Sequence, residues 1–410
     1  MSFDEARDPF AAVVDGARPA RLAELGATGP VHRMVLHTGV PAWVVTGYAE
    51  GRAVLSDPRI VRGGPSNGPY TQERPRLSAA INSHMLVADP PDHSRLRTLV
   101  SMAFTRRRIE LLEPRVEELC RELLDDLEDR FIRDGEADLI TAFAEPLSLS
   151  VILEMLGIAA RDREALRGWC EVLAAGRLVD VDAFTEAAGH MLDFLHDLLS
   201  EKRARPAADL LSALIHAHDG EDRLTDDELT SMVYLLIHAG HETTMSLIAN
   251  GTRALLLHPE QWTAMRTEPG LDVKAVEEAL RFDSPVQIPV PGIAAEDLEI
   301  GDTAVSQGDV VVVSLMGANR DPRRFAGPDV FDTSRGRDGQ TGATGHMSFG
   351  HGIHHCLGAP LARMEGRIAL GMLARRFPDL ELAGPASSLR RVPSLLLNRL
   401  ETLPVRRSEP

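Results

Sequence analysis

The sequence predicts a mainly α-helical protein with a small β portion, formed as a single domain over residues 1–410. Helical periodicity is the first reason, because apolar residues recur every three or four positions in 113–132, 182–204 and 226–257. Strand patterns are few and short, at 42–47 and over 298–315, where Gly-Asp pairs mark turns. The chain shows no internal repeat, low-complexity tract or long Ser/Gly linker, so we expect one domain.

Composition and charge predict a soluble, cytoplasmic protein. The formal net charge of −17 argues against nucleic acid or an anionic membrane as the main partner, because both favour a basic surface. No stretch reaches about 18 apolar residues free of charge, and the acidic N-terminus is unlike a signal peptide. The three cysteines are far apart and odd in number, so we expect no disulfide framework. We expect a monomer.

The segment FGHGIHHCLG, residues 349–358, holds three histidines and one cysteine, a density that suggests a metal. A structural zinc site needs four Cys or His ligands, usually as two pairs, and the sequence offers no second pair, C-x-x-C or H-E-x-x-H. One thiol among glycines instead suggests a flat cofactor close to the backbone, where side chains at Gly350, Gly352 and Gly358 would clash. The pattern that follows predicts a helix, whose N-terminus favours the thiolate of Cys356. A haem iron with a cysteine ligand fits these features.

Six residues of this segment match the pattern F-G-x-G-x-H-x-C-x-G: Phe349, Gly350, Gly352, His354, Cys356 and Gly358. This pattern is that of the cytochrome P450 family, which the sequence resembles over nearly its whole length. The resemblance implies the cytochrome P450 fold with a long central helix over the haem, haem b as cofactor, and Cys356 as the iron ligand. It also implies that the other pattern residues bind or shape the haem site. His351 and His355 lie outside the pattern, and we expect them at the surface or beside the site.

The stretch AGHETT, residues 239–244, lies within the long helical pattern of 226–257. A capping box of Thr225 and Glu228 marks the start of this helix. A glycine in mid-helix costs about 1 kcal/mol relative to alanine. Close packing of Gly240 against another helix, with threonine hydroxyls bonded to the backbone, is the plain explanation of this stretch.

The resemblance gives the same stretch a chemical role. It implies that Gly240, beside Ala239, opens a local groove for dioxygen. It further implies that the Thr243 hydroxyl holds dioxygen and its water, and that Glu242 relays protons from solvent. Cleavage of an O–O bond needs two protons at the distal oxygen, which a carboxylate next to a hydroxyl is suited to deliver. These four are the candidate catalytic residues.

The motif E-x-x-R occurs at Glu278 and Arg281. Acid and base pairs at this spacing are common on exposed helices, but the resemblance implies a structural ion pair that shapes the fold near the haem. The family usually adds a further basic residue before the haem loop. Here Val330 stands where arginine is common. Arg335 could take the place of this missing basic residue, but the sequence does not favour that assignment.

His93 and Arg97 stand one helical turn apart in DPPDHSRLRTLV, residues 89–100, a spacing that by itself also fits a solvated helix surface. The resemblance implies that both residues, together with His354, bind the haem propionates by charge-assisted hydrogen bonds. One partner is missing, because Gly292 stands at the position of a propionate-binding arginine. Either another cation or water compensates for it, or the space widens the substrate pocket.

The positions that line the substrate pocket in the family are mostly aliphatic here. They map to 62–87, 165–200, Leu235, Leu236, His238, Ala239, 286–290 and 395–397. The long Gly- and Pro-rich first segment suggests an adaptable lid, and few aromatic residues are present to stack on flat rings. We therefore expect a bulky, apolar small-molecule substrate such as a polyketide or macrolide, a terpene or a steroid. The sequence also resembles the soluble actinobacterial members that tailor antibiotics.

We expect hydroxylation or epoxidation with electrons from a separate ferredoxin and its reductase, because the sequence carries no reductase domain. Ferredoxins are acidic, as this chain is, so their docking requires a local basic patch. Candidates are FTRRR at 104–108 together with Arg363 and Arg367. An ordinary solvated arginine run is the alternative.

Two other kinds of function stay open. A P450-type peroxygenase, or an enzyme that couples or rearranges its substrate, shares the fold. A non-catalytic haem-binding sensor or carrier shares the haem site. Glu242 and Thr243 favour oxygen activation over the peroxide route, and a sensor does not need this acid and hydroxyl pair.

Overall fold

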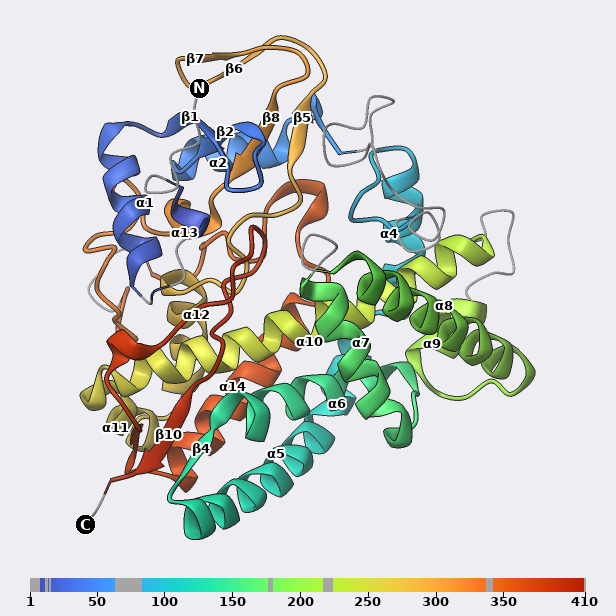
Figure 1. Cartoon of the computed structure of the whole chain (residues 1–410), viewed down its shortest axis with the longest axis vertical. Coiled ribbons are helices and arrows are strands. Elements are labelled where there is room, and N and C mark those ends of the chain that lie inside the picture. Colours follow the sequence, from blue (N-terminus) through green and yellow to red (C-terminus); the bar gives the residue numbers. More distant parts are fainter. Residues whose placement is uncertain are drawn as a thin grey trace. The chain divides into compact units, whose positions relative to one another are not determined.

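The computed structural model describes residues 8–11, 14, 16–62, 83–175, 180–216, 224–336 and 342–408. It is mainly helical with small sheets, as Figure 1 shows, which confirms the predicted fold class. The described residues form two compact units. The first unit is drawn from 1–64, 117–145 and 243–410, and the second unit from 65–116 and 146–242. The single-domain assignment stays a prediction.

The first unit contains the sheets. The larger one has the order β1-β2-β8-β5-β3, with β2 and β8 parallel and the other neighbours antiparallel. Its strands are β1 (Val31–Val35), β2 (Pro41–Val45), β8 (Val310–Val313), β5 (Gly292–Ala294) and β3 (Ile60–Val61). Strand β8 is four valines, all buried, which suits a central position between two neighbours.

Two smaller sheets complete the β portion of the described residues. Strands β6 (Leu298–Ile300) and β7 (Thr303–Val305) form the hairpin that the sequence predicts, with Gly301 at φ 58° in its turn. The other sheet has the order β4-β10-β9 and consists of β4 (Glu136–Asp138), β10 (Pro404–Arg407) and β9 (Leu380–Leu382).

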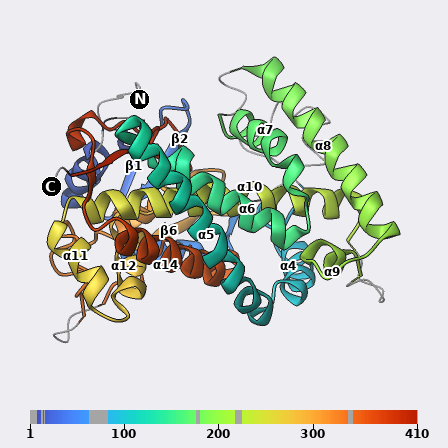
Figure 2. The same cartoon turned by 90° about the horizontal axis from the view of Figure 1, so that it is seen from below.

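The helices of the first unit are α1 (Ala17–Thr28), α2 (Tyr48–Ser56), α11 (Pro259–Thr267), α12 (Leu271–Phe282), α13 (Leu315–Ala318) and α14 (Ala359–Arg376). Helices α11 and α12 both pack against α14, and Figure 2 shows α12 and α14 side by side. Gly366 permits this approach, because a Cβ there would lie 3.3 Å from Cγ2 of Val276 in α12. The helix after the cysteine is therefore anchored on a buried neighbour.

The second unit contains α4 (Asp92–Ala103), α7 (Arg163–Ala175), α8 (Val181–Ala204) and α9 (Leu210–His216). Helices α5 (Arg106–Asp134), α6 (Glu145–Leu156) and α10 (Asp226–Leu256) continue from one unit into the other along the chain. Short 3-10 or π turns lie at Pro9–Ala11, Ile140–Ala144, Ala160–Asp162, Gly352–His354 and Ala386–Ser388. Within the described ranges, no helix combines the length and apolar character needed to cross a membrane.

The predicted start of the long helix α10 is confirmed. The Thr225 N–H donates to Glu228 Oε2 at 2.8 Å, and the Glu228 N–H donates to Thr225 Oγ1 at 3.2 Å, which is the reciprocal pattern of a capping box. Arg95 of α4 binds the same carboxylate through Nη1 at 3.3 Å and also through Nη2. The helix then runs without interruption through 239–244.

Candidate functional site

Cys356 differs from the other cysteines in its surroundings. Its side chain is exposed, whereas Cys120 and Cys170 are buried. Burial raises the pKa of the Cys120 thiol to about 12, so that thiol stays protonated and serves packing. The Cys356 N–H donates to the carbonyl of Phe349 at 2.8 Å, which closes the loop back on itself. This leaves one exposed thiol just before Gly358, the residue that caps α14.

The glycines of the loop have local backbone reasons. Gly350 and Gly352 have φ of 72° and 71°, a region that side chains disfavour. A Cβ on Gly352 would also lie 2.3 Å from the carbonyl oxygen of Leu55 at the end of α2. At Gly358 a Cβ would be in ordinary contact with Sγ of Cys356, at 3.8 Å. The turn of the loop and its approach to α2 therefore account for the first two glycines, independently of any cofactor.

Hydrogen bonds from distant segments hold the start of the loop. Asn319, just after α13, accepts from the Met347 N–H at 2.6 Å and donates to Ser348 Oγ at 2.8 Å. Ser348 Oγ donates in turn to the carbonyl of Leu280 in α12 at 2.6 Å. Asn319 and Ser348 are both buried, so each bond is shielded from water. The sequence contains no motif that pairs these residues, and our sequence analysis missed them.

The E-x-x-R pair is a buried ion cluster. Arg281 donates to Glu278 through Nε at 2.8 Å and through Nη2 at 2.7 Å. Arg335 is the third member, with Nε 3.3 Å from Glu278 Oε2 and both side chains almost fully buried. The Val330 side chain is 58% exposed, while its carbonyl accepts from both arginines. Arg335 thus fills the role that the sequence left in doubt.

The candidate catalytic stretch shows both packing and a buried acid. A Cβ on Gly240 would lie 3.0 Å from Cδ1 of Ile152 in α6, so the close-packing explanation holds within the second unit. Ala239 is exposed, whereas the Glu242 side chain is buried, at 2% exposure. Thr243, half-buried, follows Glu242 along α10. An acid and a hydroxyl are therefore adjacent in one unbroken helix.

The predicted propionate-binding residues occupy two elements. His93 is buried and Arg97 half-buried, one turn apart on α4 in the second unit. His354 is half-buried in the turn Gly352–His354 of the first unit. Of the two histidines outside the motif, His355 is exposed and His351 is partly buried, and this burial together with the nearby charge of Arg52 lowers the pKa of His351.

Gly292 leaves no open space beside its Cα. It lies in β5, next to β3, and a Cβ at this position would be 2.2 Å from Cγ2 of Ile60. The methyl group of Ile60 therefore occupies the volume in which a side chain at 292 would start. The proposed widening of the pocket at this point is not supported.

Two of the predicted substrate-lining segments lie against each other, whereas 63–82 lies outside the described residues. Val286 and Leu397 form an isolated β-bridge. The side-chain amide of Gln287 donates to the carbonyls of Ser394 and Leu397 at 2.6 and 3.0 Å. Segments 286–290 and 395–397 are thus fixed to each other by a buried amide.

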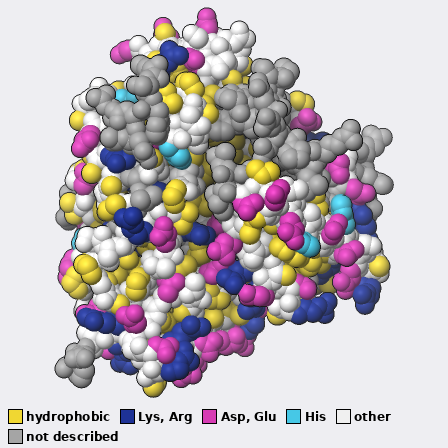
Figure 3. All heavy atoms as spheres, in the orientation of Figure 1, with side chains coloured by type: hydrophobic (Ala, Val, Ile, Leu, Met, Phe, Trp, Pro, Cys, Tyr) yellow, Lys and Arg dark blue, Asp and Glu magenta, His cyan; other side chains and the backbone are white. Residues whose placement is uncertain are grey.

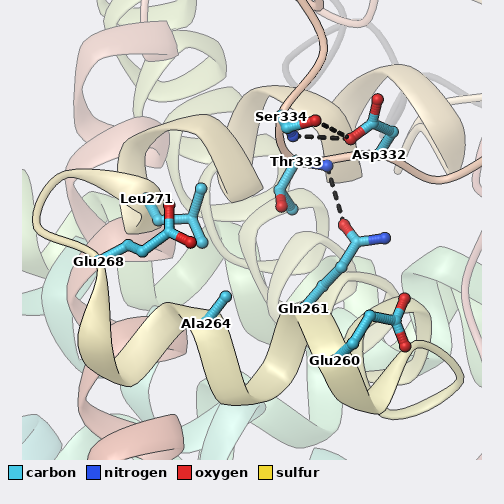
Figure 4. A pocket seen from close by; sticks show the side chains of 8 residues that line it. All are labelled: Glu260, Gln261, Ala264, Glu268, Leu271, Asp332, Thr333 and Ser334. Carbon is cyan, nitrogen blue, oxygen red and sulfur yellow. Dashed lines mark hydrogen bonds between the residues drawn. The ribbon is translucent and has the colours of Figure 1, made fainter. Parts of the chain in front are cut away.

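A pocket of about 290 Å³ lies elsewhere in the first unit (Figure 4). Its lining residues are Glu260, Gln261, Ala264, Glu268, Leu271, Asp332, Thr333 and Ser334. The Thr333 N–H donates to Gln261 Oε1 at 2.8 Å, which ties α11 to the loop that follows Val330. None of the predicted site residues lines this pocket.

The loop suits a cofactor that needs a single protein ligand. Its one exposed thiol precedes a helix N-terminus, where backbone N–H groups favour a thiolate. Among the described residues, no three His, Cys, Asp or Glu side chains converge on a common point that would hold an ion. A haem iron takes four ligands from its macrocycle and needs only one thiolate from the protein. The donor set at Cys356 therefore fits a haem.

Known proteins resemble this chain over nearly its full length. The family model described as Cytochrome P450 matches residues 272–398. Cytochrome P450 107B1 of Saccharopolyspora erythraea is 43% identical over 384 residues, which cover 92% of each chain. Polyketide biosynthesis cytochrome P450 PksS of Bacillus subtilis is 37% identical over 385 residues, again 92% of each chain.

A solved structure agrees in fold as well. The tirandamycin C-bound P450 monooxygenase TamI superposes with a TM-score of 0.84 at 41% identity, covering 96% of this chain and 98% of that one. Identity and coverage at this level show the family. The chain belongs to the cytochrome P450 family and is a haem b-dependent monooxygenase.

Proposed function

We propose that this monooxygenase inserts one oxygen atom from dioxygen into a C–H or C=C bond of a bulky, apolar substrate of the polyketide or macrolide class. The observation that carries the proposal is the place of Cys356 in a loop that matches the family motif, closed by a hydrogen bond from the Cys356 N–H to the carbonyl of Phe349 at 2.8 Å and followed directly by the N-terminus of α14. The Cys356 thiolate would hold the haem iron, and the haem would supply the redox chemistry that activates dioxygen.

The residues that would hold the haem come from the motif and from α4. Phe349, Gly350 and Gly358 shape the loop around the thiolate. His93, Arg97 and His354 are assigned to the propionates, for which imidazole and guanidinium N–H groups are suitable charge-assisted donors. Arg97 is half-buried, and its guanidinium offers N–H donors suited to a carboxylate.

Glu242 and Thr243 are assigned to proton delivery. Glu242 is buried, so a proton on its carboxyl group is shielded from bulk solvent until the group passes it on. Thr243 Oγ1 can accept a hydrogen bond and donate one at the same time, which lets it hold a water in line with the carboxylate. The preceding Ala239 is exposed and carries only a methyl group, which leaves this position of α10 accessible to a small molecule, whereas the space beside Gly240 is filled by Ile152.

The substrate class rests on the relatives and on the lining segments. PksS is named for polyketide biosynthesis, and the TamI structure holds tirandamycin C. In this chain, 286–290 and 395–397 contribute mainly aliphatic side chains, a lining suited to an apolar ligand. The buried amide of Gln287 fixes these two segments to each other, so the lining they form is preorganised.

We assign electron supply to a separate ferredoxin and its reductase, and the location to the cytoplasm. On the face that Figure 3 shows, acidic and basic side chains are interspersed. Docking of an acidic donor therefore depends on local arginines. Arg106, at the start of α5, is 89% exposed and pairs with Glu110 at 2.8 Å. Arg363 of α14 is 41% exposed and binds Glu277, so its charge is partly neutralised.

The proposal is tested by spectroscopy of the haem-loaded protein. The ferrous carbon monoxide complex should show the red-shifted absorption band of a thiolate ligand, and Cys356→Ala and Cys356→His should both abolish it. Substrates are then found by the visible spectral shift that a compound library induces, followed by product analysis with the ferredoxin system. Survival of the band in either variant would overturn the ligand assignment, and turnover with peroxide alone would favour the peroxygenase alternative.

A further inference from the structure

Three charged or polar side chains form a cluster beside Phe349 at the start of the cysteine loop. Glu277 lies on α12, His346 precedes Phe349 by three residues, and Arg363 lies on α14. All belong to the first unit. None of them appears among the residues that the motif assigns to haem, oxygen or protons.

A single carboxylate holds the other two side chains. Glu277 Oε1 accepts from Arg363 Nε at 2.6 Å, and Oε2 accepts from Arg363 Nη2 at 3.1 Å. His346 Nε2 lies 3.4 Å from Glu277 Oε2. Because His346 Nδ1 accepts the Ser348 N–H at 3.1 Å, the ring proton belongs on Nε2, facing the carboxylate.

Both held side chains cover the ring of Phe349. The Arg363 guanidinium lies 4.5 Å from the ring centroid, within the range of a cation–π contact. The His346 ring centroid lies 5.7 Å from it, at an interplanar angle of 43°. The backbone carbonyl of Phe349 accepts the Cys356 N–H at 2.8 Å. Glu277 is thus connected to Cys356 through a short series of contacts.

Burial and charge make this arrangement strong. The side chains of Glu277 and His346 are 11% and 1% exposed. Burial alone would raise the pKa of Glu277, but hydrogen bonds from His346 and Arg363 outweigh it and lower this pKa to about 2. The carboxylate is therefore ionised at neutral pH. Without it, among the described residues only the cation–π contact holds the half-exposed Arg363 over the ring, and the buried His346 loses the negative charge 3.4 Å from its Nε2.

We propose that Glu277 is a positioning residue for the thiolate loop: through Arg363 and His346 it fixes Phe349, and with it the hydrogen bond that Phe349 makes to Cys356. This inference rests on the proposed role of Cys356 as haem ligand. Groups that contact a metal ligand without binding the metal themselves orient that ligand and tune its electron donation. A fixed Phe349 therefore holds the thiolate in one position and sets the reduction potential of the bound haem.

The test uses the full-length haem-loaded protein and Glu277→Gln, which keeps the side-chain volume and removes the charge. We expect the thiolate band of the ferrous carbon monoxide complex to decay at least about twofold faster than in wild type, the lower end of the range of about two- to 160-fold that corresponds to the interaction energies of contacts coupled in one network. The reduction potential should also shift. Asp272→Asn makes the same charge change on the same helix, away from Phe349, and should leave both readouts at wild-type values.

Two further variants separate positioning from net charge. Arg363→Gln changes the charge in the opposite sense to Glu277→Gln. A pure charge effect would therefore shift the haem reduction potentials of the two variants in opposite directions and leave the thiolate band of the carbon monoxide complex stable. Positioning predicts faster band decay in both variants, and little further effect of Glu277→Gln in a Phe349→Leu background. Because Arg363 is half-exposed, Arg363→Gln tests the positioning proposal if Glu277→Gln does not take up haem.

The inference is overturned if Glu277→Gln and Arg363→Gln both match Asp272→Asn in band decay. It is also overturned if the effect of Glu277→Gln persists in full in the Phe349→Leu background. Absence of the thiolate band in the wild-type protein is a different result, which would overturn the proposed function itself.

Discussion

Arg335→Gln should destabilise the protein by removing one member of the buried cluster around Glu278. Arg335 is 3% exposed at its side chain and donates to the carbonyls of Gly327 and Val330 at 3.2 and 2.9 Å, as well as to that of Ala326. A glutamine is too short to reach these acceptors. Its amide also carries no charge to set against Glu278.

The magnitude follows from what remains paired. Removing one partner of a buried ion pair costs about 3–5 kcal/mol. Glu278 keeps two bonds from Arg281 at 2.7 and 2.8 Å, and the Val330 carbonyl keeps the bond from Arg281 at 3.0 Å. Because only part of the cluster is left unpaired, we expect the lower end of the range, about 3 kcal/mol.

The measurement is urea unfolding of the haem-loaded protein, followed by far-UV circular dichroism. Arg59→Gln is the matched control, because Arg59 is 43% exposed and pairs with Asp57 at 2.7 Å on the surface. Such an exposed pair contributes about 0–1 kcal/mol. If Arg335→Gln and Arg59→Gln lower the free energy of unfolding equally, Arg335 is not part of the stabilising cluster.

Four further changes test the residues of α10 and the arginine run. Thr243→Ala should divert electrons to hydrogen peroxide with little change in substrate binding, and Glu242→Gln should slow turnover by about 10²-fold or more; coupled, full-rate turnover in both would remove these roles. Charge reversal at 106–107 should weaken reduction by ferredoxin at low salt, as stopped-flow absorbance would detect, while substrate affinity stays constant. Gly240→Ala should lower stability, because crowding against Ile152 costs about 1–3 kcal/mol and helix propensity returns only about 1 kcal/mol. A stability gain in that variant would contradict the close packing.

Periodicity predicted the long elements well because their signals are local. Helix α8 begins at Val181, one residue before the predicted 182, and Asp180 caps it by accepting the Ala183 N–H at 2.9 Å. Helix α5 is the main difference, since it begins at Arg106 rather than at 113. Pro114 suggests a helix start in sequence, but in the structure the helix continues through it. Propensity at one residue was outweighed by packing, because Ile109, upstream of Pro114, is buried.

The sheet and the cysteine loop depend on contacts that periodicity does not encode. Strand β2 pairs in parallel with β8, so Trp43 lies opposite Val311 although long stretches of chain separate them. Asn319 likewise holds Met347 from another segment. The motif identified which residues form the loop, because each is local to it. It could not identify the groups that hold the loop in place, because those are scattered in sequence and carry no pattern of their own.

Gly292 illustrates how a departure from a family pattern can mislead when only one position is considered. In sequence it is a missing arginine, which suggests a gap and invites Gly292→Arg as the repair. In the structure Ile60 already fills that volume, with Cγ2 only 2.2 Å from where a Cβ would be. The single substitution would force β3 and β5 apart, at about 1–3 kcal/mol for overpacking, and would report this strain rather than haem binding. Gly292→Arg combined with Ile60→Ala removes the methyl group that blocks a Cβ at this position. Tighter haem retention in that double variant than in Ile60→Ala alone would show that the position still faces a propionate.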